Sequence, residues 1–192
     1  MTDIILASAS PRRAELLDQI GITYEIQVVD IDESGLANES PETLVKRLAQ
    51  EKSVAIKNAA LPVLGADTLG VLNGELLVKP RDFEHAHQML SSMSGNWHEI
   101  LSAVAISYNA KTNVLINRNR VLFRPITDAE IEAYWQTGEP QDKAGAYAIQ
   151  GLGAVFIEHI EGSYSGIMGL PLFETTKLLS ALNINTWRKN KE

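Results

Sequence analysis

Two consecutive arginines, Arg12 and Arg13, follow Ser8-Ala9-Ser10-Pro11 near the start of the chain. Ser10 and Pro11 suit the cap and the first position of a helix, so the arginines fall in its first turn, where the helix dipole disfavours cations by roughly 0.3–1 kcal/mol each. The free backbone N–H groups at this end, together with two guanidinium groups, can bind an anion the size of a phosphate. The alternative, which has equal weight, is a pair of exposed arginines on a solvated face.

Lys52 falls on the apolar face of a second predicted helix, where Val45, Leu48, Ala49 and Ile56 recur at helical spacing. The commoner outcome, slightly favoured by the pattern, is a lysine whose stem packs against the core while its ammonium reaches solvent. The alternative is an ammonium that projects into a cleft and pairs with a phosphate or a carboxylate.

Asp67 interrupts an otherwise apolar strand over residues 63–69, where a carboxylate is costly to bury without a partner or a metal ion. This cost favours a functional carboxylate over one that merely ends the strand. Lys79 lies across a hairpin that Asn73-Gly74 predicts, in the register that pairs it with Thr68. Strict alternation then points Asp67 and Lys79 to opposite faces, so their convergence requires a bulge or a bend.

A metal ion bound by this chain needs oxygen ligands. The sequence has no cysteine, and its four histidines are too scattered for a histidine-bound zinc site. Glu33 and Asp67 are the candidate ligands, because Mg²⁺ prefers one or two carboxylates with waters and phosphate oxygens. No Walker A loop, GxGxxG motif or Ser-His-Asp order is present, which excludes the usual kinase, dinucleotide-binding and acyl-transfer classes.

The composition predicts a globular chain that binds neither nucleic acid nor membrane. Its 192 residues are 45% hydrophobic and 21% charged, enough to bury a core. A net charge of -7 and a pI near 5.2 oppose a polyanion-binding surface. No apolar stretch approaches the roughly 18 residues of a membrane span, and the acidic start does not resemble a signal peptide. With cysteine absent as well, we expect a cytoplasmic protein.

Helical and strand periods alternate along the chain, which predicts an α/β fold in one continuous unit or in two lobes. The predicted strands cover residues 4–7, 24–29, 63–72, 75–79, 98–107 and 114–123, and the predicted helices cover 11–20, 41–57, 82–92 and 127–136. Seven of the 13 glycines lie between Gly138 and Gly169, a density that fits loops close to a ligand and also fits tight turns.

Ordered blocks of residues link these features along nearly the whole chain. They are Ser8–Arg13 with Leu16-Leu17, Arg47–Lys52, Gly65–Thr68, Lys79-Pro80, Asp142–Gly151, Gly162–Tyr164, and Gly169–Leu172 with Glu174-Thr175. Together they resemble the Maf nucleotide pyrophosphatases. The resemblance implies a Maf/ITPase-like fold in a single domain over residues 1–192, with a mixed twisted sheet, flanking helices and a central cleft between two lobes.

The same resemblance implies that water cleaves a nucleoside triphosphate between its α- and β-phosphates, assisted by a divalent cation, Mg²⁺ or Mn²⁺. Asp67 matches the family's proton acceptor, and Glu33 matches a carboxylate that binds metal or positions water. The other implied catalytic and substrate-binding positions are Lys52, Lys79, Arg13, Ser8 and Ser10. Also implied are a homodimer, a role in limiting incorporation of non-standard nucleotides, and a link to cell-division arrest.

Three positions distinguish subgroups of the family, and here they are Arg12, Thr68 and Gln150, which resemble the dTTP/UTP type. The other branch has tryptophan, glutamine and glutamate at these places. The amide of Gln150 can donate to a pyrimidine O4 and accept from N3–H, whereas a glutamate can only accept. Gly70 departs from the family pattern, where a larger aliphatic residue is expected, and this predicts looser packing behind the strand.

The rival class is a non-enzymatic nucleotide-binding regulator of septum formation. The intact set of Asp67, Lys52 and Lys79 opposes it, because a sensor has no need of a general base.

Overall fold

The computed structural model describes residues 2–187. Its chain forms two compact units, neither of which is continuous in sequence. Unit 1 comprises residues 2–68, 102–117 and 169–187, and unit 2 comprises residues 69–101 and 118–168. Within the described residues no helix is long and apolar enough to cross a membrane.

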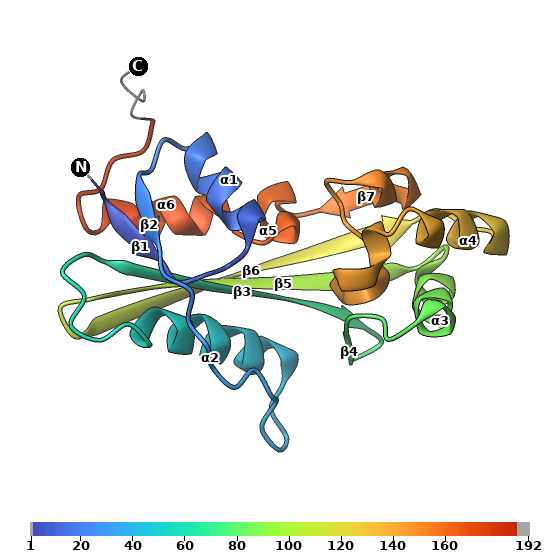
Figure 1. Ribbon diagram of the computed structural model, residues 1–192, viewed down its shortest axis with the longest axis horizontal. Helices are drawn as coiled ribbons and strands as arrows, with labels where there is room; N and C mark the ends of the chain where they lie inside the picture. The colour runs from blue at the N-terminus through green and yellow to red at the C-terminus, as the bar shows by residue number, and fades with distance from the viewer. Residues whose placement is uncertain (1, 188–192) are drawn as a thin grey trace. The chain divides into compact units, whose positions relative to one another are not determined.

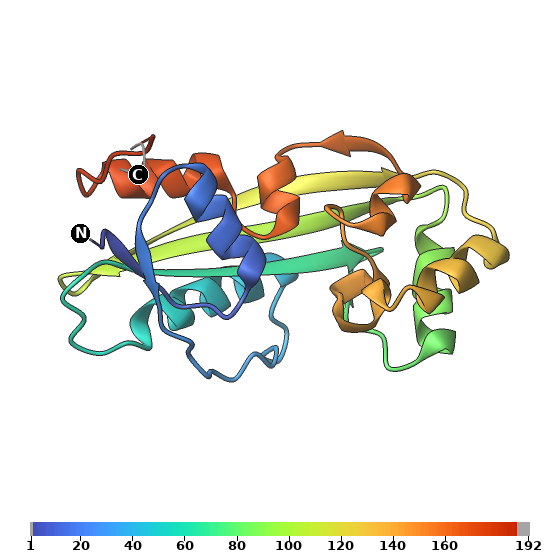
Figure 2. The same ribbon diagram turned by 45° about the horizontal axis from the view of Figure 1, so that its top comes forward.

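Unit 1 contains most of the N-terminal part of the chain. Its complete elements are β1 (Ile4–Leu6), α1 (Pro11–Gln19), β2 (Tyr24–Ile26), α2 (Pro41–Val54) and α6 (Leu172–Ser180). It also holds part of each of three long strands, β3 (Val63–Leu72), β5 (Trp97–Tyr108) and β6 (Lys111–Phe123). Helices α1 and α6 lie on one face of the sheet and α2 lies on the other (Figures 1 and 2).

Unit 2 contains β4 (Glu75–Leu77), α3 (Phe83–Met93), α4 (Asp128–Gln136), β7 (Ile157–Glu161), α5 (Tyr164–Met168) and the remaining parts of the long strands. Three short 3₁₀ turns, Glu139–Asp142, Ala144–Ala146 and Leu152–Phe156, form the glycine-rich segment. Helices α3 and α4 pack side by side, as Figure 1 shows. The core of this unit includes Leu90, Phe123, Ile131 and Phe156.

The strands form one mixed sheet in the order β2-β1-β3-β5-β6-β7, with β4 paired to β3. Strand β1 pairs with β2 and β3 in parallel, whereas the β3–β4 and β6–β7 pairs are antiparallel. Between β5 and β6 the chain turns at Asn109 and Ala110, which both have positive φ, as a two-residue hairpin turn requires. The predicted mixed α/β sheet with flanking helices is confirmed.

Helices α1 to α4 begin at or within one residue of their predicted starts. The side chains of Ser40, Asp82 and Thr127 cap α2, α3 and α4, and Thr127 with Glu130 forms the full capping box. Ser10 precedes α1 with extended backbone, but its side chain forms no capping hydrogen bond. A hydrogen bond from the backbone N–H of Ser10 to the Oγ of Ser8 ties this turn together instead.

Several predicted boundaries were too long. Strand β2 ends at Ile26 and not at Val29, and α2 ends at Val54 and not near Lys57. The β3–β4 ladder has the predicted register but ends at the pair of Gly70 with Leu77, so Thr68 and Lys79 are not a strand pair. Strand β7 and helices α5 and α6 were not predicted at all.

Gly70 does not leave loose packing behind the strand, contrary to the expectation from the family pattern. A Cβ added at Gly70 would lie 2.9 Å from Cδ1 and 3.1 Å from Cβ of Leu77. The side chain of Leu77, its partner on β4, therefore occupies the space that a larger residue would take.

Candidate functional site

Gly65 on β3 allows α2 to approach the sheet closely. A Cβ at Gly65 would lie 2.5 Å from the backbone N of Ser53 and still closer to the carbonyl oxygen of Ala49. Only a residue without a side chain fits there. Asp67 follows on the same face of β3 two residues later, since successive side chains of a strand alternate between faces. The close packing at Gly65 thus places the last turns of α2 beside Asp67.

Lys52 of α2 pairs with two carboxylates at this place. Its Nζ lies 2.7 Å from Oδ1 of Asp67 and 2.6 Å from Oε1 of Glu33. Lys52 is only 8% exposed and Asp67 6%, whereas the side chain of Glu33 is 61% exposed. The slightly favoured interpretation, a lysine that reaches solvent, is wrong, and the alternative of a carboxylate partner is correct. An apolar surrounding requires such a partner for a buried ammonium.

The carboxyl group of Asp67 titrates above its ordinary range. Burial raises its pKa, and the positive charges of Lys52 and Arg13 oppose this effect without cancelling it. Asp67 is thus a buried carboxylate with a raised pKa, held by a hydrogen bond from a lysine. A group of this kind can accept a proton near neutral pH more readily than an exposed aspartate can.

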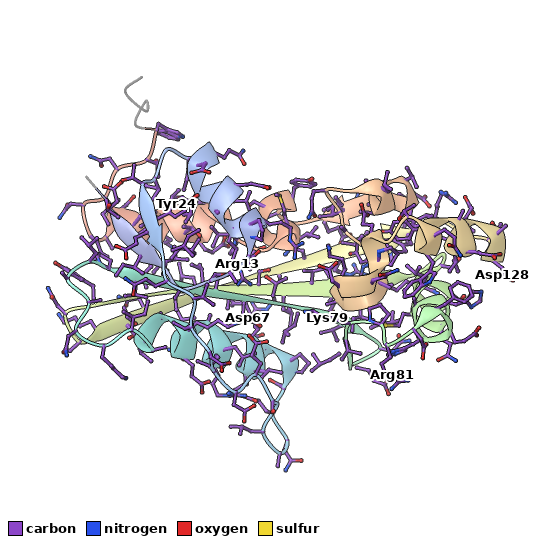
Figure 3. All side chains as sticks on the ribbon, viewed as in Figure 1. Arg13, Tyr24, Asp67, Lys79, Arg81 and Asp128 are labelled. Carbon is purple, nitrogen blue, oxygen red and sulfur yellow. The ribbon has the colours of Figure 1, made fainter. Side chains whose placement is uncertain are left out.

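Arg13, in the first turn of α1, is buried and fixed by two hydrogen bonds. Its Nε donates to the carbonyl oxygen of Gly169 at 3.0 Å, and its Nη1 donates to Oγ of Ser8 at 2.9 Å. Burial lowers the pKa of Arg13, with the negative charge of Asp67 acting in the opposite direction. Figure 3 labels Arg13 on α1 and Asp67 on β3. For Arg13 the alternative of an exposed arginine is therefore wrong.

Other predicted residues adjoin this arginine in the sequence or share its carbonyl acceptor. Ser8 is buried, whereas Ser10 and Arg12 are half-buried at the start of α1. Thr68 shares a hydrogen bond with Ser102 at 2.8 Å and donates to the same Gly169 carbonyl at 3.4 Å. The carbonyl of Gly169, whose φ is +129°, thus links Arg13 and Thr68.

Arg47 was not singled out by the sequence, although it lies in a family block. Its Nε and Nη2 donate to the two carboxylate oxygens of Glu39, each at 2.8 Å, and Nη2 also donates to the carbonyl of Ser34 at 2.8 Å. Glu51 accepts from Nη1 at 3.2 Å. Arg47 therefore fixes the loop that carries Glu33 to helix α2. Its spacing from Glu51 was a visible signal, but the partners in the loop were not.

Lys79 and Gln150 lie in unit 2, both exposed. Lys79 follows the end of β4, and the backbone N–H of Gly145 donates to the carbonyl of the preceding residue, Val78, at 3.0 Å. This hydrogen bond brings the start of the glycine-rich segment beside Lys79, which Figure 3 labels. Two contact groups lie in unit 1. Glu33, Lys52 and Asp67 form one, and Arg13, Ser8 and Thr68 form the other through the carbonyl of Gly169.

Tyr147 of the Asp142–Gly151 block is held by a buried histidine. Nε2 of His98 lies 2.7 Å from the hydroxyl of Tyr147, and both rings pack edge-on against Phe123. Burial lowers the pKa of His98 to about 4. His98 is therefore a neutral structural group that fixes the root of the glycine-rich segment.

The carboxylates present fit a divalent cation whose remaining coordination positions are filled by other oxygens, such as those of water and phosphate. No group of three or more histidine, aspartate or glutamate side chains gathers anywhere in residues 2–187. Glu33 and Asp67 meet at the Lys52 ammonium, and Glu33 is open to solvent. Two carboxylates with waters and phosphate oxygens are the set that Mg²⁺ accepts.

Comparisons with known proteins identify the family of this chain. A family model described as Maf-like protein matches residues 3–182. A protein of Alkalilimnicola ehrlichii named dTTP/UTP pyrophosphatase is 51% identical, covering 96% of this chain and 95% of its own. A protein of the same name from Escherichia coli O157:H7 is 49% identical, covering 100% and 98%.

The fold also occurs among solved structures. One example is that of a HAM1 protein from Coxiella burnetii, with a TM-score of 0.53 and 17% identity, covering 94% of this chain and 100% of that one. At this identity the likeness concerns the fold alone. The family model, the full-length relatives and the residues around Asp67 lead to one conclusion: the chain belongs to the Maf-like protein family.

Proposed function

We propose that this chain is a nucleotide pyrophosphatase that hydrolyses dTTP and UTP to the nucleoside monophosphate and pyrophosphate. The observation that carries the proposal is the buried carboxylate of Asp67, with its raised pKa and its hydrogen bond to Lys52. Relatives that are about half identical over their full length are named for this activity. The whole chain acts as one functional domain in this proposal.

In the proposed reaction the oxygen of a water molecule attacks the α-phosphorus while Asp67 accepts its proton. The bond from the α-phosphorus to the bridging oxygen breaks, and pyrophosphate leaves with that oxygen. Lys52, Arg13 and Lys79 bind phosphate oxygens and stabilise the charge that grows in the transition state. Ser8 and Ser10 contribute to the same binding region through the turn before α1.

Glu33 and Asp67 are the residues that would hold Mg²⁺ or Mn²⁺. The ion, when bound, neutralises charge on the phosphate oxygens. Because Lys52 lies between the two carboxylates, it keeps them together before any ion binds.

Base selection is assigned to Gln150, with Arg12 and Thr68 as the other positions of the dTTP/UTP type. The Gln150 amide donates to O4 and accepts from N3–H of uracil or thymine. Gln150→Glu keeps the shape and removes the donor. We expect the ratio of kcat/KM for UTP over GTP to fall roughly tenfold to a hundredfold, the cost of one unmatched polar group. An unchanged ratio in a folded variant would contradict the assignment.

The direct test of the activity is pyrophosphate release from a panel of nucleoside triphosphates with Mg²⁺ or Mn²⁺. We expect turnover of dTTP and UTP that exceeds turnover of GTP and ATP. Tight nucleotide binding without any pyrophosphate release would favour the rival regulator of septum formation. Release from purine nucleotides alone would keep the enzyme class and reject the pyrimidine assignment. A homodimer stays a prediction of the family resemblance.

A further inference from the structure

The loop that carries Gln150 is folded around one carboxylate, that of Glu139. Oε1 of Glu139 accepts from the hydroxyl of Tyr134 at 2.6 Å and from the backbone N–H of Gly153 at 3.0 Å. Oε2 accepts from the backbone N–H of Leu152 at 2.8 Å. Two of the three residues that follow Gln150 are therefore bound to the same side chain.

Tyr134 of helix α4 binds both Glu139 and the loop. Its hydroxyl donates to Glu139 and accepts from the backbone N–H of Ala148 at 3.3 Å. The loop is closed on itself by a further bond from Gly151 N–H to the carbonyl of Ala148 at 3.2 Å. Gln150 thus lies between Ala148 and Leu152, which are both held by this pair of side chains.

The two glycines of the loop are required by the same pair. A Cβ at Gly151 would overlap the carboxylate of Glu139, and a Cβ at Gly153 would lie 2.6 Å from the hydroxyl of Tyr134. Neither Gly151 nor Gly153 has a positive φ. The close approach of neighbouring atoms, and not a left-handed backbone, therefore explains why glycine occupies both positions. The carboxylate and the hydroxyl occupy the space that two side chains would otherwise fill.

Hydrogen bonds from backbone N–H groups to a carboxylate are stronger than those to a neutral acceptor. Charge is therefore a functional part of this arrangement, because an amide in place of the carboxylate would set its own N–H₂ against one of the loop N–H groups. Gln150 itself is exposed, so its placement depends on the backbone on each side of it. A base-reading amide needs such support, since a loose reader discriminates poorly.

We propose that Glu139, supported by Tyr134, is the positioning residue for base selection by Gln150. The inference rests on the proposed function and names how that function obtains its specificity. Glu139 acts through the loop and does not contact the base. Its loss should consequently affect discrimination between bases more than the chemical step, whose general base Asp67 lies in unit 1.

The test compares Glu139→Gln and Tyr134→Phe with a matched control, Glu130→Gln. Glu130 is also a carboxylate that accepts a backbone N–H, that of Thr127, and it binds Arg124, but it has no bond to the Gln150 loop. All four proteins are assayed for kcat and KM with UTP, dTTP and GTP. Amide hydrogen exchange of residues 148–153 is measured without nucleotide, so that this readout is independent of activity.

We expect Glu139→Gln to lower the UTP over GTP ratio of kcat/KM by about tenfold, mainly through KM, and to raise exchange at Leu152 and Gly153. Tyr134→Phe should act in the same direction and less strongly, because the carboxylate remains. Glu130→Gln should leave both the ratio and the loop exchange unchanged.

An unchanged ratio in Glu139→Gln, with faster loop exchange and a folded protein, would overturn the positioning role. Unchanged amide exchange in both Glu139→Gln and Tyr134→Phe would show that Glu139 and Tyr134 do not hold the Gln150 loop. Failure of the proposed function has a different signature, because the wild-type chain would then release no pyrophosphate from any nucleotide before a variant is compared.

Discussion

At the scale of single residues, Asp67 combines three features that bear on proton transfer. It is buried, it is bonded to a lysine, and its pKa is nevertheless raised. A buried ion pair adds little to the stability of the fold, because the cost of desolvating both charges offsets most of their attraction. The raised pKa of Asp67 supports the proton-accepting role proposed for it.

Replacing Asp67 with Asn should lower turnover by roughly 10² to 10⁴, the usual contribution of a positioned general base, while the fold remains intact. The asparagine keeps an oxygen for Lys52, and Glu33 still balances the ammonium. The measurement is kcat for UTP together with the thermal unfolding midpoint. Wild-type turnover in Asp67→Asn would remove this residue from the mechanism.

The sequence predicted which charged side chains are buried better than it predicted their partners. Asp67, Lys52 and Arg13 stood out because a charge on an apolar face or in a first helical turn needs compensation. Their partners, the carbonyl of Gly169 and the exposed Glu33, come from segments distant in sequence, and Gly169 offers only a backbone oxygen. No pattern in the chain could show that Lys52 meets two carboxylates.

At the scale of elements, two contacts of α2 build the site: Gly65 receives the helix, and Arg47 holds the loop of Glu33 to it. The strands and capped helices were predictable because Ser40, Asp82, Thr127 and the Asn73-Gly74 turn act locally. The elements after Gln136 were not, since 3₁₀ turns around Glu139 and short helices have no distinct periodicity.

Gly65→Ala should reduce stability by about 1–3 kcal/mol, the usual cost of overpacking, and should also lower activity, because the added methyl pushes against backbone atoms of α2 beside Lys52. Gly70→Ala is the matched control in the same strand, where the contact is the flexible side chain of Leu77. Chemical unfolding and kcat measure the two effects. Equal losses in both variants would show that the close approach of α2 has no special role.

Arg47→Lys should release the Glu33 loop. One ammonium group cannot replace the guanidinium group, whose nitrogens donate to Glu39, Ser34 and Glu51. Faster amide exchange at Leu36, whose N–H binds Glu39, is the first expected result. The second is a roughly tenfold higher metal concentration for half-maximal activity. Lys46→Ala, which removes a pair with Glu42 on the same helix, should change neither quantity.

At the scale of the whole molecule, acid stability should depend on His98. Its Nδ1 is buried without a hydrogen-bond partner among the described residues, and protonation would leave an N–H there without an acceptor. Because its pKa is about 4 in the folded chain and near 6.5 when unfolded, the unfolded state binds more protons between these values.

The free energy of unfolding should therefore decrease by up to roughly 3 kcal/mol as the pH falls from 6.5 towards 4. His98→Gln keeps a partner for the hydroxyl of Tyr147 and cannot titrate. Denaturant unfolding at several pH values should give a shallower dependence for this variant, even if it is less stable throughout. Parallel curves for the two proteins would assign the acid sensitivity to other groups.

The two units also differ from separate modules, because the chain passes between them after residues 68, 101, 117 and 168. No single cut in the gene separates the segment set that carries Asp67 from the set that carries Gln150. Exchange of one whole unit by recombination would need a breakpoint at each of these crossings. Under the proposed function, a new nucleotide preference is reached by substitutions in the loop that carries Gln150, without exchange of the unit that carries Asp67.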